Sequence, residues 1–568
     1  MMSLNKNIKV FLLLTFTLFI SVSCDEQLTE LNVDPLGVDP SQGNPNQVMT
    51  NVLTGAAMSY LDLGYGEIAG VMQHTQKDGW FSGHNHYAWD AKDWAGWYGL
   101  LRNNNYMMER AEALDFDFHM GVGHTMRGFL FGTIADLWGD APYSNALQGN
   151  TGETELMFPE YDSQETIYQG VISDLEEAAS IFSSADNTGV APSYDVFYGG
   201  DIEKWHKLAN SLLLRYYMRV SDKMPAMAKS GIEGLAANGM LITSSADDAT
   251  MSFIGASSSD SWPANTTDGG SNFRRIKPGQ PFLDALMEKN DPRMSVWIAP
   301  VHVQWVPDFT LPTKTEEFIR KNGEIMEGVT SMLDQQFLDE IAAGNVFTRR
   351  YNPDLIGPDD QPINDDMYVG VPPGLFAPDA WNYNPTPGQN VQNQHVSQLA
   401  PKFRDTEGEM LLARIISAAE VHFILAEAAL EGYSVGSAEM HYNDGIKSSL
   451  EAWGVGDQYD DYITEPDVVF DGTLQQVIEQ KWIASWTTAT EAWFDFRRTG
   501  YPELVPGPAS EQPVLPVRYM YGNDEIAYNP ENLEEGRSSL TITEYSGPRQ
   551  EDSQWSKPWI IQDTNKPW

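Results

Sequence analysis

Apolar side chains recur every three to four residues through much of the chain, the period of an α-helix that buries one face. Two such faces are clear between residues 94 and 138. The first comprises Trp94, Trp97, Tyr98, Leu101, Asn105 and Met108, and the second comprises Met126, Leu130, Thr133, Ile134 and Leu137. The second face stops at Gly139, a residue that commonly ends helices.

Two more helices are predicted by capping residues that stand ahead of a periodic run. Asp162 and Glu165 form a capping-box pattern, and Asp201 is a good N-cap residue. The apolar faces that follow are Ile167, Val171, Leu175, Ala178 and Phe182 in the first case, and Trp205, Leu208, Leu212, Tyr216 and Arg219 in the second.

The carboxyl-terminal part contains a pair of predicted helices separated by glycine. One runs from Ile416 to Leu430 before Gly432, and the next runs from Ala438 to Trp453 before Gly454. A further helix is expected over 474–482. Helix pairs with small residues at their crossings resemble tetratricopeptide repeats. We therefore predict an all-α fold of tetratricopeptide-like helical repeats, without a β-sheet domain.

Two long stretches do not follow the helical period. Residues 244–312 and 351–405 are rich in Pro, Gly, Asn, Ser and Asp, with scattered aromatic residues. Irregular segments of this length within a compact protein usually serve a function. We expect them to form a loop-rich face over the helical scaffold, within a single domain that spans residues 47–568.

The amino end has the pattern of a secretory signal. Lys6 and Lys9 precede an apolar run from Val10 to Ile20, which is too short to span a bilayer. Cys24, the one cysteine in the chain, follows at the expected cleavage site. We interpret residues 1–23 as a lipoprotein signal peptide, Cys24 as the lipidation site and residues 24–46 as a polar tether. Ordinary secretion with an incidental cysteine is the alternative.

Composition narrows the classes of ligand. The chain has 80 acidic and 35 basic residues among 568, a formal net charge of −45. Such a field repels nucleic acids and anionic lipids and favours neutral or cationic ligands. It also argues against polyanionic glycans, although a local basic pocket around Arg274, Arg275 and Lys277 would change that expectation.

A series of short phrases, in order along nearly the whole chain, resembles the SusD/RagB family of outer-membrane nutrient-binding lipoproteins. The phrases include Phe131–Ala146, Tyr161–Tyr168, Tyr198–Asp201, Ala209–Arg215, Asn290–Arg293, Tyr368–Pro372, Ala426–Ala429, Gln480–Trp482, Glu491–Trp493, Arg497–Pro502 and Pro516–Arg518. Asp25 and Glu26 after Cys24 look like the surface-export signal common in this family.

The resemblance implies a helical fold of four tetratricopeptide-like units with a variable loop-rich face. It also implies a lipid-anchored protein, exposed on the cell surface at the outer membrane, that acts as a lid on a SusC-like TonB-dependent transporter. Family members capture oligosaccharides, or peptides in some branches, and pass them to the channel.

Aromatic rings in loops are the candidates for glycan contacts, because indoles match the apolar faces of sugar rings. Trp94, Trp97, Trp205, Trp453 and Trp482 lie on helix faces and are expected in the core. Six aromatic residues in loops or irregular segments remain, for which surface stacking and loop anchoring are both open: Trp80, Trp89, Trp262, Trp305, Trp381 and Tyr383. Asn85 is a further candidate, since its amide could hydrogen-bond sugar hydroxyls.

The sequence offers little evidence for a metal site or a catalytic site. His84 and His86 lie two residues apart, but a metal site needs three or four ligands. The acidic pairs at 359–360 and 365–366 could bind calcium, yet their spacing is not that of a calcium-binding helix–loop–helix motif. No metalloprotease His-Glu-x-x-His, nucleophile-elbow or phosphate-loop motif is present. We expect a non-catalytic protein without a cofactor that binds a neutral oligosaccharide, such as a β-glucan; the alternatives are a peptide receptor and a glycoside hydrolase.

Overall fold

The computed structural model describes residues 42–77, 82–257, 259–263, 275–301, 303–307, 318–321, 324–330, 347–351, 368–375 and 396–564. Four of these ranges, between residues 303 and 351, are described as strands without their side chains. Residues 46–568 belong to one compact unit. Cys24, the signal peptide and all but the end of the predicted tether lie outside the described residues.

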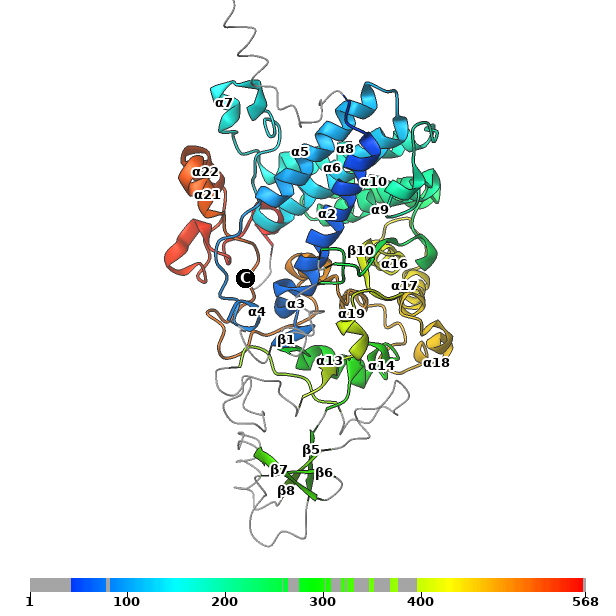
Figure 1. Cartoon of the computed structure of the whole chain (residues 1–568), viewed down its shortest axis with the longest axis vertical. Helices are drawn as coiled ribbons and strands as arrows, with labels where there is room; N and C mark the ends of the chain where they lie inside the picture. Colours follow the sequence, from blue (N-terminus) through cyan, green and yellow to red (C-terminus); the bar gives the residue numbers. More distant parts are fainter. Residues whose placement is uncertain are drawn as a thin grey trace, which may run out of the picture. The chain divides into compact units, whose positions relative to one another are not determined.

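The amino-terminal half of the unit is a layer of helices that pack in chain order (Figure 1). Helix α5 (Ala95–Glu112) contacts α6 (Asp117–Trp138), α6 contacts α8 (Gln164–Phe182), and α8 contacts α9 (Ile202–Arg219). Helix α10 (Pro225–Asn238) follows on α9. Helix α2 (Pro45–Tyr65) joins this layer through Tyr60, whose ring lies 5.1 Å from that of Phe129 on α6.

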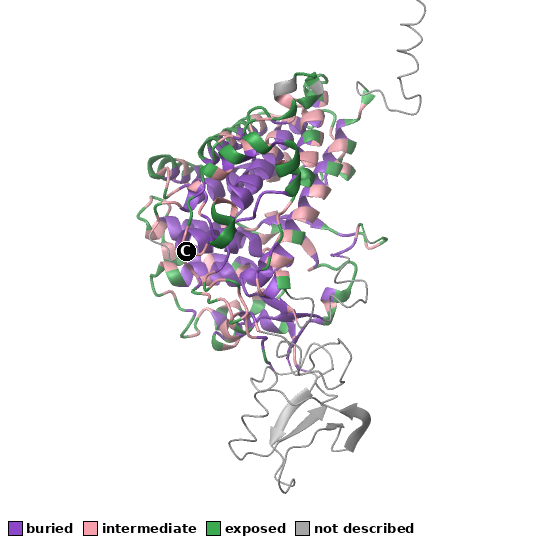
Figure 2. Ribbon diagram, turned by 90° about the vertical axis from the view of Figure 1, so that its left-hand side faces the viewer, coloured by how far each residue is buried: buried purple, intermediate pink, exposed green. Residues whose placement is uncertain are grey.

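The carboxyl-terminal half repeats the arrangement. Helix α16 (Ala418–Leu430) contacts α17 (Ala438–Ala452) and α19 (Leu474–Ala484). Helix α20 (Ala489–Thr499) follows α19, and both α16 and α20 contact α9 of the first half. Figure 2 shows buried residues filling the inside of these helical layers, with exposed residues along the outer turns. The predicted all-α repeat fold is therefore confirmed.

The helix boundaries agree closely with the sequence pattern. Helix α6 ends at Trp138, and Gly139 follows with a φ of 102° that favours glycine. The Asp201 side chain accepts a hydrogen bond from the Lys204 N–H, as an N-cap should. The cap of α8 is one residue later than predicted, because Ser163 rather than Asp162 accepts the Thr166 N–H.

The close approach of α6 and α9 depends on a glycine. A Cβ added at Gly132 would lie 2.1 Å from the Tyr216 hydroxyl oxygen. Any side chain at this position would force either the Tyr216 ring or the two helices to shift, because this ring fills the space beside Gly132.

The expectation that residues 244–312 contain no helix is wrong. Helix α13 (Gln280–Glu288) lies there, followed by a single turn, α14 (Met294–Trp297). Pro281 looks like a helix breaker, but in the first turn it sacrifices no hydrogen bond. Phe282, Leu283 and Leu286 are buried and hold α13 against the core.

Short strands also occur, although none was predicted. Three two-stranded ladders are antiparallel: β1 (Thr75–Lys77) with β3 (Ile276–Pro278), β2 (Ala249–Ser252) with β10 (Leu412–Ile416), and β4 (Ile298–Ala299) with β9 (Gln398–Leu399). A four-stranded sheet has the order β5 (Val303–Pro307), β8 (Phe347–Tyr351), β6 (Phe318–Lys321) and β7 (Glu324–Thr330). These short strands leave the helical class unchanged.

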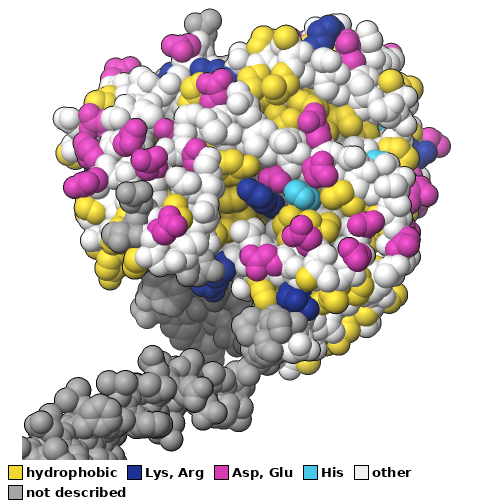
Figure 3. All heavy atoms as spheres, turned by 90° about the horizontal axis from the view of Figure 1, so that it is seen from above, with side chains coloured by type: hydrophobic (Ala, Val, Ile, Leu, Met, Phe, Trp, Pro, Cys, Tyr) yellow, Lys and Arg dark blue, Asp and Glu magenta, His cyan; other side chains and the backbone are white. Residues whose placement is uncertain are grey.

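Charge is spread over the surface shown in Figure 3, where acidic side chains are scattered among uncharged ones and basic side chains are few. Dispersion of this kind fits a solvated acidic surface better than one concentrated cation site. Within the described residues, no helix combines the length and the apolar character needed to cross a membrane.

Candidate functional site

The described ends of several irregular segments meet at one place, which we call the loop floor and define as residues 75–77, 276–279, 369–375 and 397–399. Lys77 at the end of β1 pairs with Ile276 in β3. Val371 continues this ladder, since its N–H donates to the Pro278 carbonyl at 2.9 Å and its carbonyl accepts from Gln280 at 2.8 Å. The Ser397 N–H donates to the Val369 carbonyl at 2.8 Å.

This arrangement brings together the flanks of the segments that carry three of the seven predicted glycan contacts. Trp80 lies between Lys77 and Ser82, and Trp381 and Tyr383 lie between Leu375 and Val396. Trp80, Trp381 and Tyr383 are themselves outside the described residues. Trp305 lies in β5 opposite Arg349 of β8, and its side chain is likewise outside the described part.

Asn85 does not face solvent. Its side chain is fully buried, and its amide oxygen accepts the Lys77 N–H while its amide nitrogen donates to the Lys77 carbonyl, both at 2.8 Å. Asn85 therefore fastens the two ends of the short segment that contains Trp80. The structure does not agree with the prediction that Asn85 contacts sugar, because both polar atoms of its amide are hydrogen-bonded to the Lys77 backbone.

Trp89 and Trp262 are also buried, with exposed fractions of 3% and 0%. The Trp89 Nε1–H donates to the Gly83 carbonyl at 2.9 Å, and its ring meets Tyr519 edge-on at 5.0 Å. The Trp262 ring meets Tyr65 edge-on at 5.2 Å. Neither indole offers a free face to a ligand in this structure, so both fit the loop-anchoring alternative and not the surface-stacking one.

The tryptophans expected in the core are there. Trp94, Trp97, Trp205, Trp453 and Trp482 are all less than 10% exposed, as are Trp138, Trp297 and Trp493. Beneath the loop floor the rings of Phe282, Trp297 and Trp486 are stacked, with centroids 5.1–6.0 Å apart. This stack supports the floor from inside and is packing, since none of its rings reaches solvent.

The two histidines of the polar loop point to different partners. His84 Nε2 lies 3.0 Å from the Thr75 hydroxyl, whereas His86 Nε2 lies 2.9 Å from the Leu375 carbonyl. The described residues contain no group of three His, Cys, Asp or Glu side chains suited to a metal. The acidic pairs at 359–360 and 365–366 are outside the described residues.

Burial keeps the ionisable groups under the floor neutral or paired. It lowers the pKa of His74 to about 3, against the opposing hydrogen bond to the Trp482 carbonyl. Burial and the nearby Lys77 hold the pKa of His84 well below its usual value. Lys277 is fully buried and donates to Gln398 Oε1, and Arg275 is 6% exposed, while Arg274 is outside the described residues. The described part of the predicted basic pocket is therefore buried structure.

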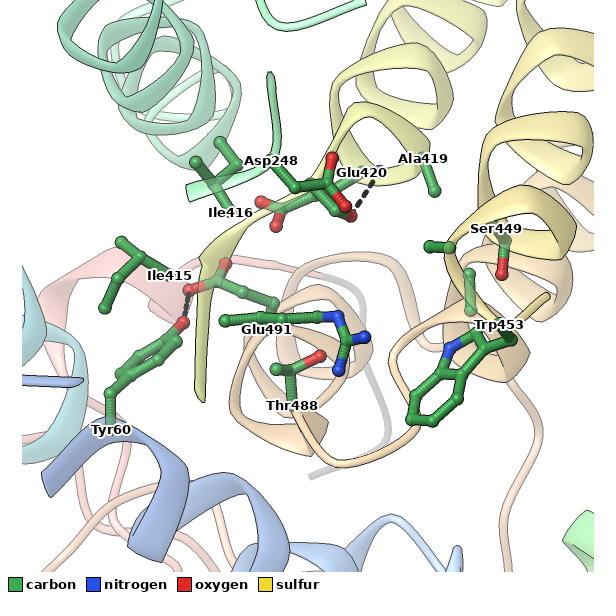
Figure 4. Close-up of a pocket in the computed structure, with 14 residues that line it drawn as sticks. Tyr60, Asp248, Ile415, Ile416, Ala419, Glu420, Ser449, Trp453, Thr488 and Glu491 are labelled. Atoms are coloured by element: carbon green, nitrogen blue, oxygen red, sulfur yellow. Dashed lines mark hydrogen bonds between the residues drawn. The ribbon is translucent and has the colours of Figure 1, made fainter. Parts of the chain in front are cut away.

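A network of buried charges joins the two halves of the unit. Glu491 on α20 accepts a hydrogen bond from the Tyr60 hydroxyl at 2.5 Å and pairs with Arg215 and Arg219 on α9. Asp136 on α6 pairs with Arg219 at 3.2 Å and with Arg497 on α20 at 3.5 Å. Figure 4 shows Tyr60 and Glu491 pointing toward each other.

The network continues toward α16 and α19. Asp495 pairs with Lys481 at 2.7 Å and with Arg498 at 3.1 Å, and Arg498 also holds Glu427. Burial alone would raise the pKa of Asp495, but Lys481 and Arg498 outweigh it and bring this pKa to about 2. Asp495 is therefore ionised at neutral pH, as buried ion pairs require.

The cavity in Figure 4 lies beside this network and has a volume of about 20 Å³. That space holds one water molecule and is too small for a sugar ring. The cluster of Asp248, Arg414, Glu420 and Glu491 around it is therefore structural. Several of the phrases quoted from the sequence supply this network, through Asp136, Arg215, Lys481, Glu491 and Arg497–Arg498. The phrases can be read from the sequence, but their meeting in one buried charge network cannot.

Comparison of the chain with known proteins identifies a family. The model of the SusD-like family described as "starch-binding associating with outer membrane" matches residues 38–305 and 359–522, which is most of the chain. No curated protein matches the chain.

Solved structures share the fold at low sequence identity. An outer-membrane protein from Bacteroides vulgatus ATCC 8482, assigned to nutrient binding, has 22% identity and a TM-score of 0.69, over 92% of this chain and 100% of that one. A chitin-binding SusD homologue from Flavobacterium johnsoniae has 20% identity and a TM-score of 0.64, over 91% and 99%. A chitin-binding protein has 22% identity and a TM-score of 0.67, over 92% and 100%.

The family is described as starch-binding, which is a binding role and not an enzymatic one, and this removes the glycoside-hydrolase alternative. The helical scaffold, the buried charge network built from the family phrases, and the match over most of the chain agree with one another. The chain therefore belongs to the SusD-like family of outer-membrane glycan-binding proteins.

Proposed function

We propose that the protein binds a neutral oligosaccharide at the loop floor, by stacking sugar rings on aromatic side chains, and passes it to a SusC-like TonB-dependent transporter. In this proposal Cys24 carries the lipid anchor and the protein is exposed at the cell surface. Peptide capture is the alternative within the same family.

One observation carries the proposal: the flanks of the segments bearing Trp80, Trp381 and Tyr383 meet at the loop floor. Trp80 is three residues from Lys77 in the sequence, and Trp381 is six residues from Leu375. The segments that carry the three aromatic residues therefore leave the described structure at one surface, and stacked aromatic rings suit a sugar chain.

The electrostatics of the site favour an uncharged ligand. His74 and His84 are neutral, Lys277 is buried against Gln398, and the chain carries a net charge of −45. A polyanionic glycan would be repelled at ordinary salt. Two structural neighbours are chitin-binding proteins, and chitin is an uncharged β-linked polymer. A neutral β-linked glycan, a β-glucan or chitin oligosaccharide, is therefore the ligand we propose.

The test is affinity gel electrophoresis of the protein against neutral and acidic polysaccharides. Trp80→Ala and Trp381→Ala should weaken retardation by a neutral glycan, since each stacked ring contributes about 1–2 kcal/mol by analogy with buried aromatic area. Trp89→Phe serves as a control for an anchoring tryptophan and should leave retardation unchanged. Binding of peptides but of no glycan would contradict the proposal.

A further inference from the structure

A second, separate cavity of about 240 Å³ opens at the start of α5. Its walls come from the α5 start, the 142–147 turn, Pro159 and the start of α21 (Asn523–Tyr528). In Figure 1, α7 (Thr154–Met157) and α21 lie at the upper left, apart from β1 and α13. The cavity is thus distinct from the loop floor. Its lining residues are Asp93, Trp94, Ala95, Tyr98, Pro142, Ala146, Leu147, Pro159, Gly522, Asp524 and Glu525.

Apart from its carboxylates the wall is mostly apolar, and the polar atoms of its two aromatic side chains, Trp94 and Tyr98, are already bonded. The Tyr98 hydroxyl donates to the Pro142 carbonyl at 2.6 Å, and the Trp94 Nε1–H donates to Glu525 Oε1 at 3.1 Å. A sugar ring placed here would give up hydrogen bonds to water and would find acceptors only at the carboxylates, because the Trp94 and Tyr98 donors are already used. The cavity therefore suits a ligand with an apolar body.

The charge around the cavity is of one sign. Asp93 and Asp524 are exposed, and Glu525 is half-buried. The Glu525 carboxylate is fixed by two neutral donors, Trp94 Nε1 and the Tyr161 hydroxyl at 2.6 Å. No Lys, Arg or His occurs among the residues described as lining the cavity. Three carboxylates without a cation in the lining favour a positively charged group.

Exposed apolar side chains stand next to the lining residues Pro159 and Glu525 in the sequence. Met157 and Phe158 are 58% and 45% exposed, and Ile526 and Tyr528 are 47% and 69% exposed. Asn532, on the helix that follows α21, donates to the Phe158 carbonyl at 2.9 Å. Apolar residues gathered beside a cavity are typical of a surface that binds protein.

We propose that this cavity binds a lysine or arginine side chain of a polypeptide partner. The aliphatic stem would lie along Trp94, Tyr98 and Leu147, and its charged end would meet Asp524 and Glu525. Such side chains combine an apolar stem with a terminal cation. Apolar residues flanking the basic residue would cover the rim, which favours a peptide over an amino sugar.

The probes are four peptides of the form acetyl-Leu-Xaa-Leu-amide, in which Xaa is Lys, Arg, norleucine or Glu, measured by isothermal titration calorimetry on the whole protein. We expect the Lys and Arg peptides to bind at least fivefold more tightly than the norleucine peptide, and the preference to shrink as salt is raised. The Glu peptide should not bind.

Matched variants separate charge from shape. The double variant Asp524→Asn, Glu525→Gln should bind the Lys and norleucine peptides equally. Ala146→Phe should prevent binding of the Lys peptide and of the norleucine peptide, because the larger side chain fills the cavity. Glu534→Gln, an exposed change on the next helix, should alter neither. Equal binding of the Lys and norleucine peptides, or the absence of binding, would overturn the proposal.

Discussion

Replacing Glu491 by Gln tests whether the buried charge network holds the two halves of the unit together. This carboxylate joins three helices, because it accepts from Tyr60 on α2 at 2.5 Å and pairs with Arg215 and Arg219 on α9. Burial would raise the pKa of Glu491, but Arg215 and Arg219 outweigh it and lower this pKa. The variant keeps the shape of the side chain and removes its charge.

The expected cost follows from the partners that remain. Removing one member of a buried ion pair costs about 3–5 kcal/mol, since the other member stays buried without compensation. Arg215 keeps Glu420 at 2.7 Å, and Arg219 keeps Asp136 at 3.2 Å. We therefore expect a cost near the lower end, about 3 kcal/mol.

The assay is thermal unfolding followed by calorimetry or circular dichroism at pH 7. An unfolding entropy of about 2.1 cal/mol/K per residue gives about 1.1 kcal/mol/K for a unit of roughly 500 residues, so Tm should fall by about 3 °C. Glu503→Gln, at an exposed position, is the control and should leave Tm unchanged. A Tm for Glu491→Gln within about 1 °C of the parent would refute a role of this network in stability.

Two further predictions concern buried residues. Trp262→Ala should destabilise the protein by about 3–5 kcal/mol, measured as a lower urea midpoint, because it empties a fully buried site against Tyr65; lost glycan binding at unchanged stability would contradict the anchoring role. Burial raises the pKa of Asp248 to about 7. Between about pH 4 and 7 the Asp248 carboxyl therefore stays protonated in the folded protein but is ionised in the unfolded chain. Its contribution to the free energy of unfolding decreases as the pH rises through that window. The Tm of Asp248→Asn minus the Tm of the parent should therefore increase as the pH is raised from 4 to 8. A Tm difference that does not vary with pH would contradict this prediction.

The helical scaffold was predictable because its signals are local. The apolar period places α6 and α9, and Asp201 caps α9 as expected. Helix α13 was missed because Pro281 resembles a breaker unless the helix is known to start beside it. The order of the family phrases was sufficient to predict the family.

The candidate site was predicted less well, because burial depends on partners far apart in the sequence. Nothing near Trp262 in the chain shows that Tyr65 and Phe403 surround its ring. In the sequence Asn85 looks like a free amide in a polar loop, yet its side chain is hydrogen-bonded to the backbone of Lys77. The pairing of Tyr60 with Glu491 spans 431 residues. The second cavity was missed for the same reason, since Trp94 on a helix face predicts only core.

The most direct test of the central claim is affinity gel electrophoresis of the protein and its Trp80→Ala, Trp381→Ala double variant. The panel contains a neutral β-glucan, a soluble chitin derivative and an acidic alginate. The account predicts that a neutral β-linked glycan retards the parent and that the double variant migrates freely with unchanged Tm. Retardation by alginate alone, or equal retardation of parent and variant, would contradict it.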